Sequence, residues 1–242
     1  MAHAPYTHIV PDSDTAVIFI HGILGTPDHF LPFLSLIPED ISVVNLLLDG
    51  HGKGVREFSR TSMAKWEAQV DAAVDAALAA HQKVFLVAHS LGSLLAIEQA
   101  VKKPVAGLFL LAVPIRLRLR FRIISTSWKV YTNRIADTDA YAAAAKNCCG
   151  VQMHKNPLLY LGWIPRFLEL FSKIRETRTR LKELHTPCCA YQSADDELVR
   201  RDSAAYLKTH SAMEVFSLEN SSHYYYDPSD MAFLRQEFSK LL

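Results

Sequence analysis

The chain has 242 residues, half of them hydrophobic and 21% charged, with a formal net charge of +1. A chain of this length can bury a large core, and α/β chains of this size usually form one domain. The near-neutral charge gives no case for a nucleic-acid partner, and no apolar run is long enough for a membrane-spanning helix. The N-terminus also lacks a secretory signal, so we expect a cytoplasmic protein.

Short apolar runs alternate with helical patterns along the chain. We expect strands at 16–20, 41–47, 83–88, 105–112, 187–192 and 213–218, with a further edge strand at 6–10. We expect helices at 27–37, 63–80, 91–102, 200–210 and 228–241. This alternation predicts an α/β fold with a mostly parallel sheet and helices on both faces.

A long insertion separates the expected strands at 105–112 and 187–192. Residues 115–184 are too many for an ordinary connection, and we expect them to form a helical cap or lid. The core then consists of residues 1–114 and 185–242. Apolar side chains recur at helical spacing in the later part of the cap, which predicts a stripe that packs on the sheet or lines an apolar ligand pocket. They are Phe167, Leu168, Phe171, Ile174 and Leu181.

Four arginines alternate with apolar residues at the start of the insertion, from Arg116 to Arg122. Strict alternation over residues 115–124 predicts a strand with one basic and one apolar face. The arginines either attract acidic groups, in an anionic substrate or in a transient contact with a membrane surface, or form a solvated face. The solvated face is favoured, because the charges are few and the whole chain is nearly neutral.

The expected strand at 83–88 runs into Ala88-His89-Ser90-Leu91-Gly92, and a helix follows at once. This order predicts a nucleophile elbow, a sharp turn that holds a serine in a strained conformation above the sheet. The turn requires small residues two places before and after the serine, and Ala88 and Gly92 meet that requirement. We therefore interpret Ser90 as a nucleophile rather than as a simple helix cap.

A serine nucleophile needs a base and an acid, which follow it along the chain on this scaffold. His223, which follows the last expected strand, is the predicted base. The acid comes from a polar turn after the strand at 187–192, where Asp195, Asp196 and Glu197 are consecutive and only one can face the imidazole. Four other histidines are less suitable by position. They are His89, His154, His185 and His210.

An oxyanion hole is expected where the strand at 16–20 ends in a glycine-containing turn. The backbone N–H groups of Ile23 and Leu91 would converge on the negative oxygen that develops during the reaction. Gly22 allows the backbone to come close to the substrate. We expect His21 to hold this turn by hydrogen bonds rather than to take part in the chemistry.

These motifs together resemble the α/β-hydrolase superfamily, and within it the small carboxylesterase and monoacylglycerol-lipase-like enzymes. The resemblance rests on residues 19–25, 49–52, 89–92, 192–199 and 220–223. It implies that Asp196 rather than Asp195 is the acid of the triad. It also implies hydrolysis of carboxylic esters, with short to medium acyl chains or monoacylglycerol-like, through an acyl-enzyme.

The same triad can also cleave thioesters, amides or carbon–carbon bonds, because a fold does not determine a substrate. A ligand-binding receptor without catalysis is the remaining alternative, and an intact Ser90, Asp196 and His223 argue against it. The expected partner is therefore a small-molecule ester.

No cofactor is expected. The chain has neither the paired His/Cys spacing of a metal site nor the glycine-rich motif of a dinucleotide site. Its four cysteines form two adjacent pairs, at 148–149 and 188–189, and we expect all of them to be reduced and structural.

Overall fold

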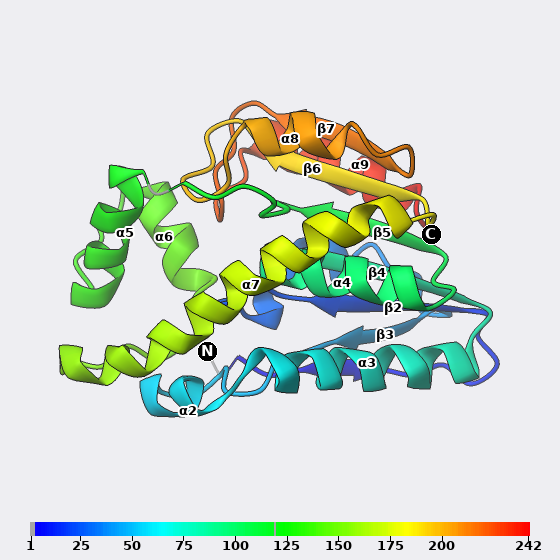
Figure 1. Ribbon diagram of the computed structural model, residues 1–242, viewed down its shortest axis with the longest axis horizontal. Coiled ribbons are helices and arrows are strands. Elements are labelled where there is room, and N and C mark those ends of the chain that lie inside the picture. The colour runs from blue at the N-terminus through cyan, green and yellow to red at the C-terminus, as the bar shows by residue number, and fades with distance from the viewer. Residues whose placement is uncertain (1–2, 119) are drawn as a thin grey trace.

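The structure, a computed structural model that describes residues 3–118 and 120–242, contains a seven-stranded sheet (Figure 1). The strand order is β1-β3-β2-β4-β5-β6-β7, and only the edge pair β1 and β3 is antiparallel. The strands are β1 (Tyr6–His8), β2 (Thr15–Ile20), β3 (Ser42–Asn45), β4 (Lys83–His89), β5 (Gly107–Leu111), β6 (Cys188–Ser193) and β7 (Met213–Leu218). The predicted α/β class with a mostly parallel sheet is confirmed.

Helices cover both faces, with α3, α4 and α7 in front of the sheet in Figure 1 and α9 behind it. The α-helices are α1 (Leu31–Leu34), α2 (Val55–Arg60), α3 (Met63–Ala80), α4 (Leu91–Lys102), α5 (Phe121–Thr132), α6 (Ala140–Asn147), α7 (Ile164–Arg180), α8 (Asp202–Leu207) and α9 (Pro228–Ser239). Short 3-10 helices are η1 (Pro27–Phe30), η2 (Pro157–Trp163) and η3 (Leu181–Glu183).

Alternate residues of the central strands enter two separate hydrophobic clusters. One cluster packs under α3, α4 and α7 and includes Ile18, Ile20, Leu86, Ala88, Leu108 and Leu110. The other packs under α1 and α9 and includes Val17, Phe19, Val87, Phe109, Leu111 and Tyr191. Because both faces of a parallel sheet are buried, its strands are continuous apolar runs, which is why they were recognisable in the sequence.

Most predicted elements are present, and α3 and α4 have the predicted bounds. The helix expected over 27–37 is divided into η1 and α1. Pro32 explains the break, because proline has no N–H to donate to the carbonyl of Asp28. The N–H of Leu31 donates to that carbonyl instead.

The strand expected over 115–124 is wrong in its second half. Leu117 forms a single antiparallel bridge with Val199, and α5 begins at Phe121. Leu119 lies outside the described residues. The same stretch also carries a helical period through Phe121, Ile124 and Trp128, and this period prevails where no neighbouring strand continues the pairing.

Of the apolar stripe expected over 167–181, only part packs on the sheet, and the alternative that it lines a ligand pocket stays a prediction. Ile174 and Leu181 are buried, but Leu168 is 61% exposed and Phe171 is 46% exposed. The buried face of α7 instead includes Lys173, which is 3% exposed. A charged residue can be buried there because acidic side chains from distant parts of the chain lie against it as partners.

Lys173 lies at the centre of an ion-pair cluster between α7, α4 and α3. Its Nζ contacts the carboxylate of Glu98, which is itself buried, and lies 2.6 Å from Glu67 Oε1.

Lys173→Met is expected to lower the free energy of unfolding by about 3 kcal/mol, because it leaves a buried carboxylate without this cation. Urea denaturation measures the change. Lys182→Met, an exposed lysine on η3, is the matched control, and an equal loss in both variants would contradict the prediction.

The segment around Gly150, within the insertion at 115–184, is hydrogen-bonded to two loops from the first part of the chain. The Gly150 N–H donates to Leu24 O at 2.8 Å, and its carbonyl accepts from the Gly52 N–H at 2.7 Å. A Cβ atom on Gly150 would overlap the carbonyl of Gly25, so this close approach requires glycine. In Figure 1, α5 and α6 lie beside each other at the left edge, away from the sheet.

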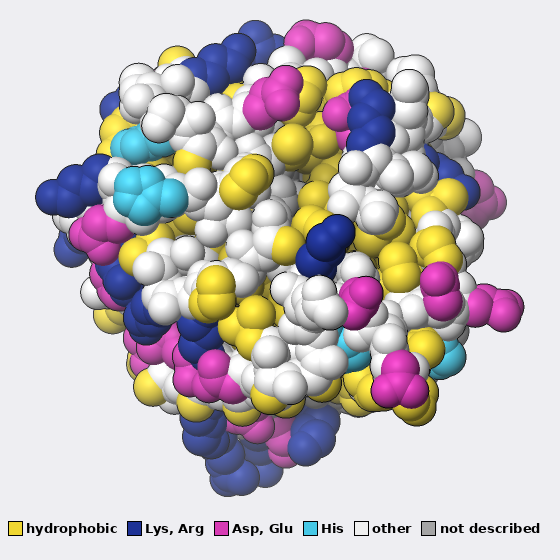
Figure 2. Space-filling model, turned by 90° about the vertical axis from the view of Figure 1, so that its right-hand side faces the viewer, with side chains coloured by type: hydrophobic (Ala, Val, Ile, Leu, Met, Phe, Trp, Pro, Cys, Tyr) yellow, Lys and Arg dark blue, Asp and Glu magenta, His cyan; other side chains and the backbone are white. Residues whose placement is uncertain are grey.

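The end of the molecule opposite to α5 and α6 carries scattered charges. Figure 2 shows Lys and Arg side chains interspersed with Asp and Glu over this face. Both signs are present, as the net charge of +1 implies. Strong electrostatic attraction to a polyanion is therefore not expected at this end.

Candidate active site

The predicted nucleophile lies at the point where the strand order reverses. From β2 the chain proceeds to β3 on one side of it and then to β4 on the other side. Connections from the two central strands β2 and β4 therefore diverge at their carboxyl ends, which is where open α/β sheets form their sites. Ser90 follows β4 there, and the turn at 21–25 follows β2.

Ser90 has the backbone conformation that a nucleophile elbow requires. Its φ is +52° and its ψ is −119°, and it caps the N-terminus of α4. Its N–H donates to Leu111 O at 2.9 Å, which ties the turn to β5. A Cβ atom on Gly92 would overlap the carbonyl of Ile20, so the helix can approach β2 only with glycine at this position.

Asp196 and His223 form a buried pair. His223 Nδ1 lies 2.8 Å from Asp196 Oδ2, and the two side chains are 2% and 1% exposed. The N–H groups of Leu198 and Val199 both donate to Asp196 Oδ1 at 2.7 Å. Because the carboxylate accepts at both oxygens, His223 carries its proton on Nδ1 and leaves Nε2 free to accept.

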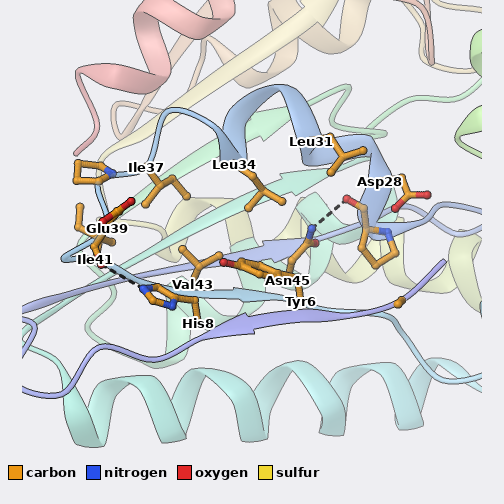
Figure 3. Close-up of a pocket in the computed structure, with 13 residues that line it drawn as sticks. Tyr6, His8, Asp28, Leu31, Leu34, Ile37, Glu39, Ile41, Val43 and Asn45 are labelled. Carbon is orange, nitrogen blue, oxygen red and sulfur yellow. Dashed lines mark hydrogen bonds between the residues drawn. The ribbon is translucent and has the colours of Figure 1, made fainter. Parts of the chain in front are cut away.

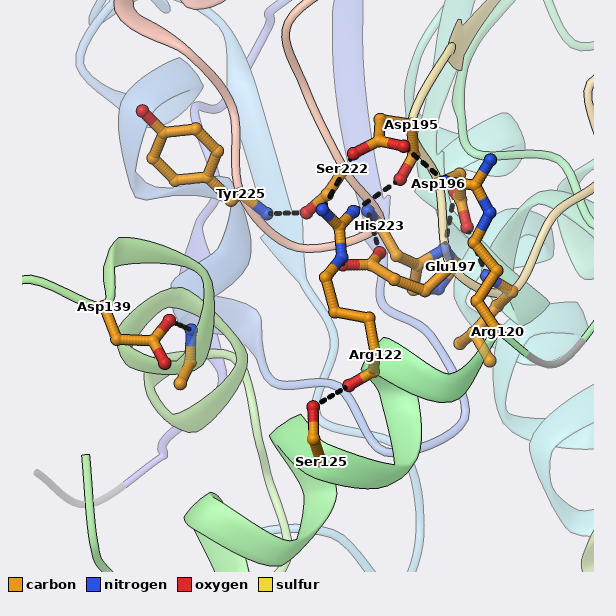
Figure 4. A network of polar contacts seen from close by, with 12 residues as sticks. Arg120, Arg122, Ser125, Asp139, Asp195, Asp196, Glu197, Ser222, His223 and Tyr225 are labelled. Atoms are coloured by element: carbon orange, nitrogen blue, oxygen red, sulfur yellow. Dashed lines mark hydrogen bonds and ion pairs between the residues drawn. The ribbon is translucent and has the colours of Figure 1, made fainter. Parts of the chain in front are cut away.

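Of the two candidate aspartates, the structure brings Asp196 to His223. Asp195 points instead to Arg120 and Arg122, as Figure 4 shows, and the guanidinium groups of both arginines lower the pKa of this carboxyl. Glu197, the third acidic residue of this turn, is buried, and its carboxylate is ion-paired with Arg122.

His89 joins the loop of His223 to the elbow. Its Nε2–H donates to the carbonyl of His223 at 3.0 Å, and the two rings lie 4.8 Å apart. Since His89 directly precedes Ser90, this bond links the loop of the candidate base to the elbow that carries the candidate nucleophile. Of the other histidines considered, His154 and His185 are exposed and His210 is half-buried beyond α8.

The turn at 21–25 passes directly beside the elbow. A Cβ atom on Gly22 would lie 3.1 Å from Ser90 Cβ. The Gly22 carbonyl accepts from His21 Nδ1 and from the Gly25 N–H, both at 2.9 Å. In a planar peptide the N–H points opposite to the carbonyl, so the N–H of Ile23 points away from these two donors.

His21 and His51 hold this turn in place. His21 Nε2 accepts from the Leu48 N–H at 3.0 Å, and His51 Nε2–H donates to Ile23 O at 2.7 Å. The role expected for His21, holding the turn by hydrogen bonds, is confirmed. Leu91, the other predicted oxyanion donor, is the first residue of α4, where the backbone N–H groups of a helix are free.

Sequence reasoning missed His29, because it lies on a short helix without a motif. Its ring lies 4.1 Å from that of His89, and burial lowers its pKa to about 3. Burial also lowers the pKa of His21 and His89 well below the ordinary value of 6.5. These histidines therefore stay neutral while the protein is folded at neutral pH.

The buried histidines make stability depend on pH. Below about pH 6.5 the unfolded chain binds protons that folded His29 does not bind, so stability falls as the pH falls, by about 1.4 kcal/mol per unit for this residue. The free energy of unfolding is measured with urea at pH 7.5 and at pH 5. We expect His29→Gln to reduce its loss between these two pH values by about 2 kcal/mol. His154→Gln, at an exposed position, is the control. An unchanged loss in His29→Gln would refute the assignment.

A cavity of about 570 Å³ lies at the β1 edge of the sheet, between β1, β3 and α1 (Figure 3). Its walls include Tyr6, Leu34 and Asn45. None of the residues that line it belongs to the elbow or to the loops of Asp196 and His223. The cavity is therefore separate from the candidate active site, where Ser90 is 8% exposed.

Over residues 3–118 and 120–242, no three His, Cys, Asp or Glu side chains are grouped so that they could hold a metal ion. None of the helices in these ranges has the length and apolarity needed to cross a membrane. All four cysteines are free.

The chain belongs to the α/β-hydrolase family, since the model of that family, described as "Alpha/beta hydrolase family", matches residues 17–236. This confirms at the family level the resemblance found in the sequence. The protein is thus a hydrolase of the α/β fold. Comparison with curated proteins finds no match.

Solved structures of similar fold cover nearly the whole chain. A structure of the metagenome-derived lipolytic enzymes LipS and LipT has 18% identity and a TM-score of 0.75, covering 99% of this chain and 97% of that chain. The monoacylglycerol lipase of Paleococcus ferrophilus has 14% identity and a TM-score of 0.68, with coverages of 98% and 97%. Est1E from Butyrivibrio proteoclasticus, bound to ferulic acid, has 15% identity and a TM-score of 0.65, with coverages of 98% and 92%.

Proposed function

We propose that this protein is a serine hydrolase that cleaves carboxylic esters through an acyl-enzyme. The observation that carries the proposal is the buried Asp196–His223 pair, which the hydrogen bond from His89 links to the elbow of the strained Ser90. A nucleophile, a base and an acid that orients the base are the parts that acyl transfer requires.

In the proposed reaction, Ser90 Oγ attacks the ester carbonyl while His223 Nε2 takes its proton. Asp196 keeps the imidazole in the correct tautomer and stabilises its charged form. The N–H groups of Ile23 and Leu91 hold the negative oxygen of the tetrahedral intermediate. His223 then protonates the departing alcohol, and a water molecule activated by the same histidine releases the acid and restores Ser90.

The proposed substrates are esters of short to medium acyl chains or monoacylglycerol-like esters. Residues 115–184 are proposed to form a cap over Ser90, and their exposed apolar side chains would provide an apolar approach for an acyl chain. These side chains include Phe121, Trp128, Leu158 and Leu168. Two of the similar structures are named as lipolytic enzymes or a lipase, and the third binds ferulic acid, which supports an ester substrate.

Turnover of p-nitrophenyl esters from acetate to palmitate tests this proposal, together with labelling of the protein by a fluorophosphonate. We expect hydrolysis with one preferred chain length, and a label that peptide mass spectrometry places on Ser90. His223→Ala should abolish both signals, whereas the matched variant His210→Ala should retain them. Ester turnover without a label on Ser90 would refute the nucleophile. A label on Ser90 without turnover would refute the ester, and amides and thioesters would then be assayed.

A further inference from the structure

Three residues hold three different atoms of His223. Asp196 accepts from its Nδ1, and His89 donates to its carbonyl oxygen. The third contact is made by Glu197, whose Oε2 accepts the backbone N–H of His223 at 3.1 Å. The orientation of the imidazole therefore depends on two backbone bonds as well as on the triad acid.

The Glu197 side chain is 6% exposed, so its charge needs a partner inside the protein. Arg122 supplies the partner, with its Nε 2.9 Å from Glu197 Oε1 (Figure 4). One carboxylate oxygen, Oε1, thus faces Arg122, and the other, Oε2, accepts the His223 amide. Without Arg122 the carboxylate would turn towards water, and this change weakens its bond to His223.

Arg122 holds the residues on both sides of Asp196. Besides Glu197, its Nη1 lies 2.7 Å from Asp195 Oδ2, and its Nη2 donates to the Asp195 carbonyl at 2.7 Å. Arg122 belongs to the first turn of α5, and its guanidinium lies 4.7 Å from the centre of the Tyr141 ring on α6. One side chain therefore joins two cap helices to the loop that carries the triad acid.

The other arginines of the run contact the same loop in ways that do not reach His223. Arg118 donates to the Asp196 carbonyl, and Arg120 pairs with Asp195. Arg116 Nη1 lies 2.8 Å from Asp202 Oδ2, beyond the acid. From the sequence, the arginine run was interpreted as attracting acidic groups or as a solvated face. Neither interpretation predicted these contacts. Arg120 also donates its backbone N–H to the Glu197 carbonyl at 3.2 Å. Among the four arginines, as far as the structure describes them, Arg122 is the one whose guanidinium forms an ion pair with the Glu197 carboxylate.

We propose that Arg122 and Glu197 are positioning residues for His223, and that through them the placement of α5 and α6 sets the alignment of the base. This inference rests on the proposed function, in which His223 accepts the proton of Ser90. It gives Arg122, the last of the alternating arginines, a role in the reaction. A cap that moves away takes Arg122 with it and weakens one of the three contacts that hold His223.

The test compares Arg122→Ala, Glu197→Gln and the double variant with Arg116→Ala, which removes an ion pair of the same segment. We expect kcat for the preferred ester to fall about 10–100-fold in each single variant, with KM within about twofold, because the base is misplaced while the pocket is intact. The double variant should lose no more than the larger single loss, since both residues act along one path. Arg122→Lys should recover part of kcat, and Arg116→Ala should retain it.

Amide hydrogen exchange of His223, followed by NMR without substrate, gives a readout independent of turnover. It should accelerate in Arg122→Ala and Glu197→Gln and not in Arg116→Ala. Unchanged exchange, additive losses of kcat, or an equal loss in Arg116→Ala would overturn the proposal. If the wild-type protein neither hydrolyses esters nor labels at Ser90, the proposed function fails, and the exchange of His223 still decides whether Arg122 and Glu197 hold it.

Discussion

Ser90→Ala is expected to lower kcat for esters by about 10⁴–10⁶-fold without unfolding the protein. Only the hydroxyl oxygen is removed, and alanine keeps the Cβ atom that the elbow already accommodates. The acid, the base and the turn at 21–25 remain in place, so substrate binding should change little. Steady-state hydrolysis of p-nitrophenyl esters measures the loss. Retention of more than about one hundredth of the wild-type kcat would show that the nucleophile lies elsewhere.

Ser90→Gly separates catalysis from strain at the same position. The φ of +52° is unfavourable for serine and alanine and accessible to glycine. Ser90→Gly is therefore expected to be inactive and more stable than Ser90→Ala, by about 1 kcal/mol in urea unfolding. A glycine variant less stable than the alanine variant would mean that the elbow stores no strain.

Asp196→Asn is expected to lower kcat by about 10⁴-fold, because the hydrogen bonds around this residue dictate how an amide would sit. Two backbone N–H groups, of Leu198 and Val199, point at Oδ1. The asparagine oxygen must occupy that position, so its NH₂ group faces His223 Nδ1. The imidazole then has to accept at Nδ1 and carry its proton on Nε2, where it can no longer take the proton of Ser90.

Asp195→Asn is the matched control for this prediction. The Asp195 side chain is 38% exposed and pairs with Arg120 and Arg122 rather than with His223. A partly exposed ion pair contributes little, so kcat should fall by less than about tenfold. Comparable losses in the two asparagine variants would contradict the assignment of Asp196 as the acid.

The parts of the fold and site that were predictable from the sequence depend on local patterns. The apolar run before Ser90, the small residues around it and the helix after it all lie within the single stretch 83–102. The choice between Asp195 and Asp196 was less accessible, because consecutive residues of a turn face different directions. It rested on family resemblance, whereas the structure distinguishes them by the N–H groups of Leu198 and Val199.

Features with partners far along the chain could not be predicted in this way. Lys173 reads as part of a polar helix face, and only the approach of Glu98, 75 residues earlier, makes it a buried residue. Arg122 and Glu197 are likewise 75 positions apart, so neither charge predicts the other. His29 is buried against His89 by tertiary packing alone. In each case the burial or pairing of the side chain depends on a contact with a residue far along the chain. No spacing pattern in the sequence indicates such a contact.

The close packing of Gly150 has a practical consequence for protein engineering. Gly150 is hydrogen-bonded to both Leu24 and Gly52. Residues 115–184, which we propose to form a cap, are therefore attached to the rest of the chain near their middle as well as at their two ends. A transplanted cap from a relative would have to reproduce this glycine and both backbone bonds. Exchange of residues 123–147 alone avoids them and also keeps Arg122, so the helices α5 and α6 form the unit best suited to libraries that alter substrate preference.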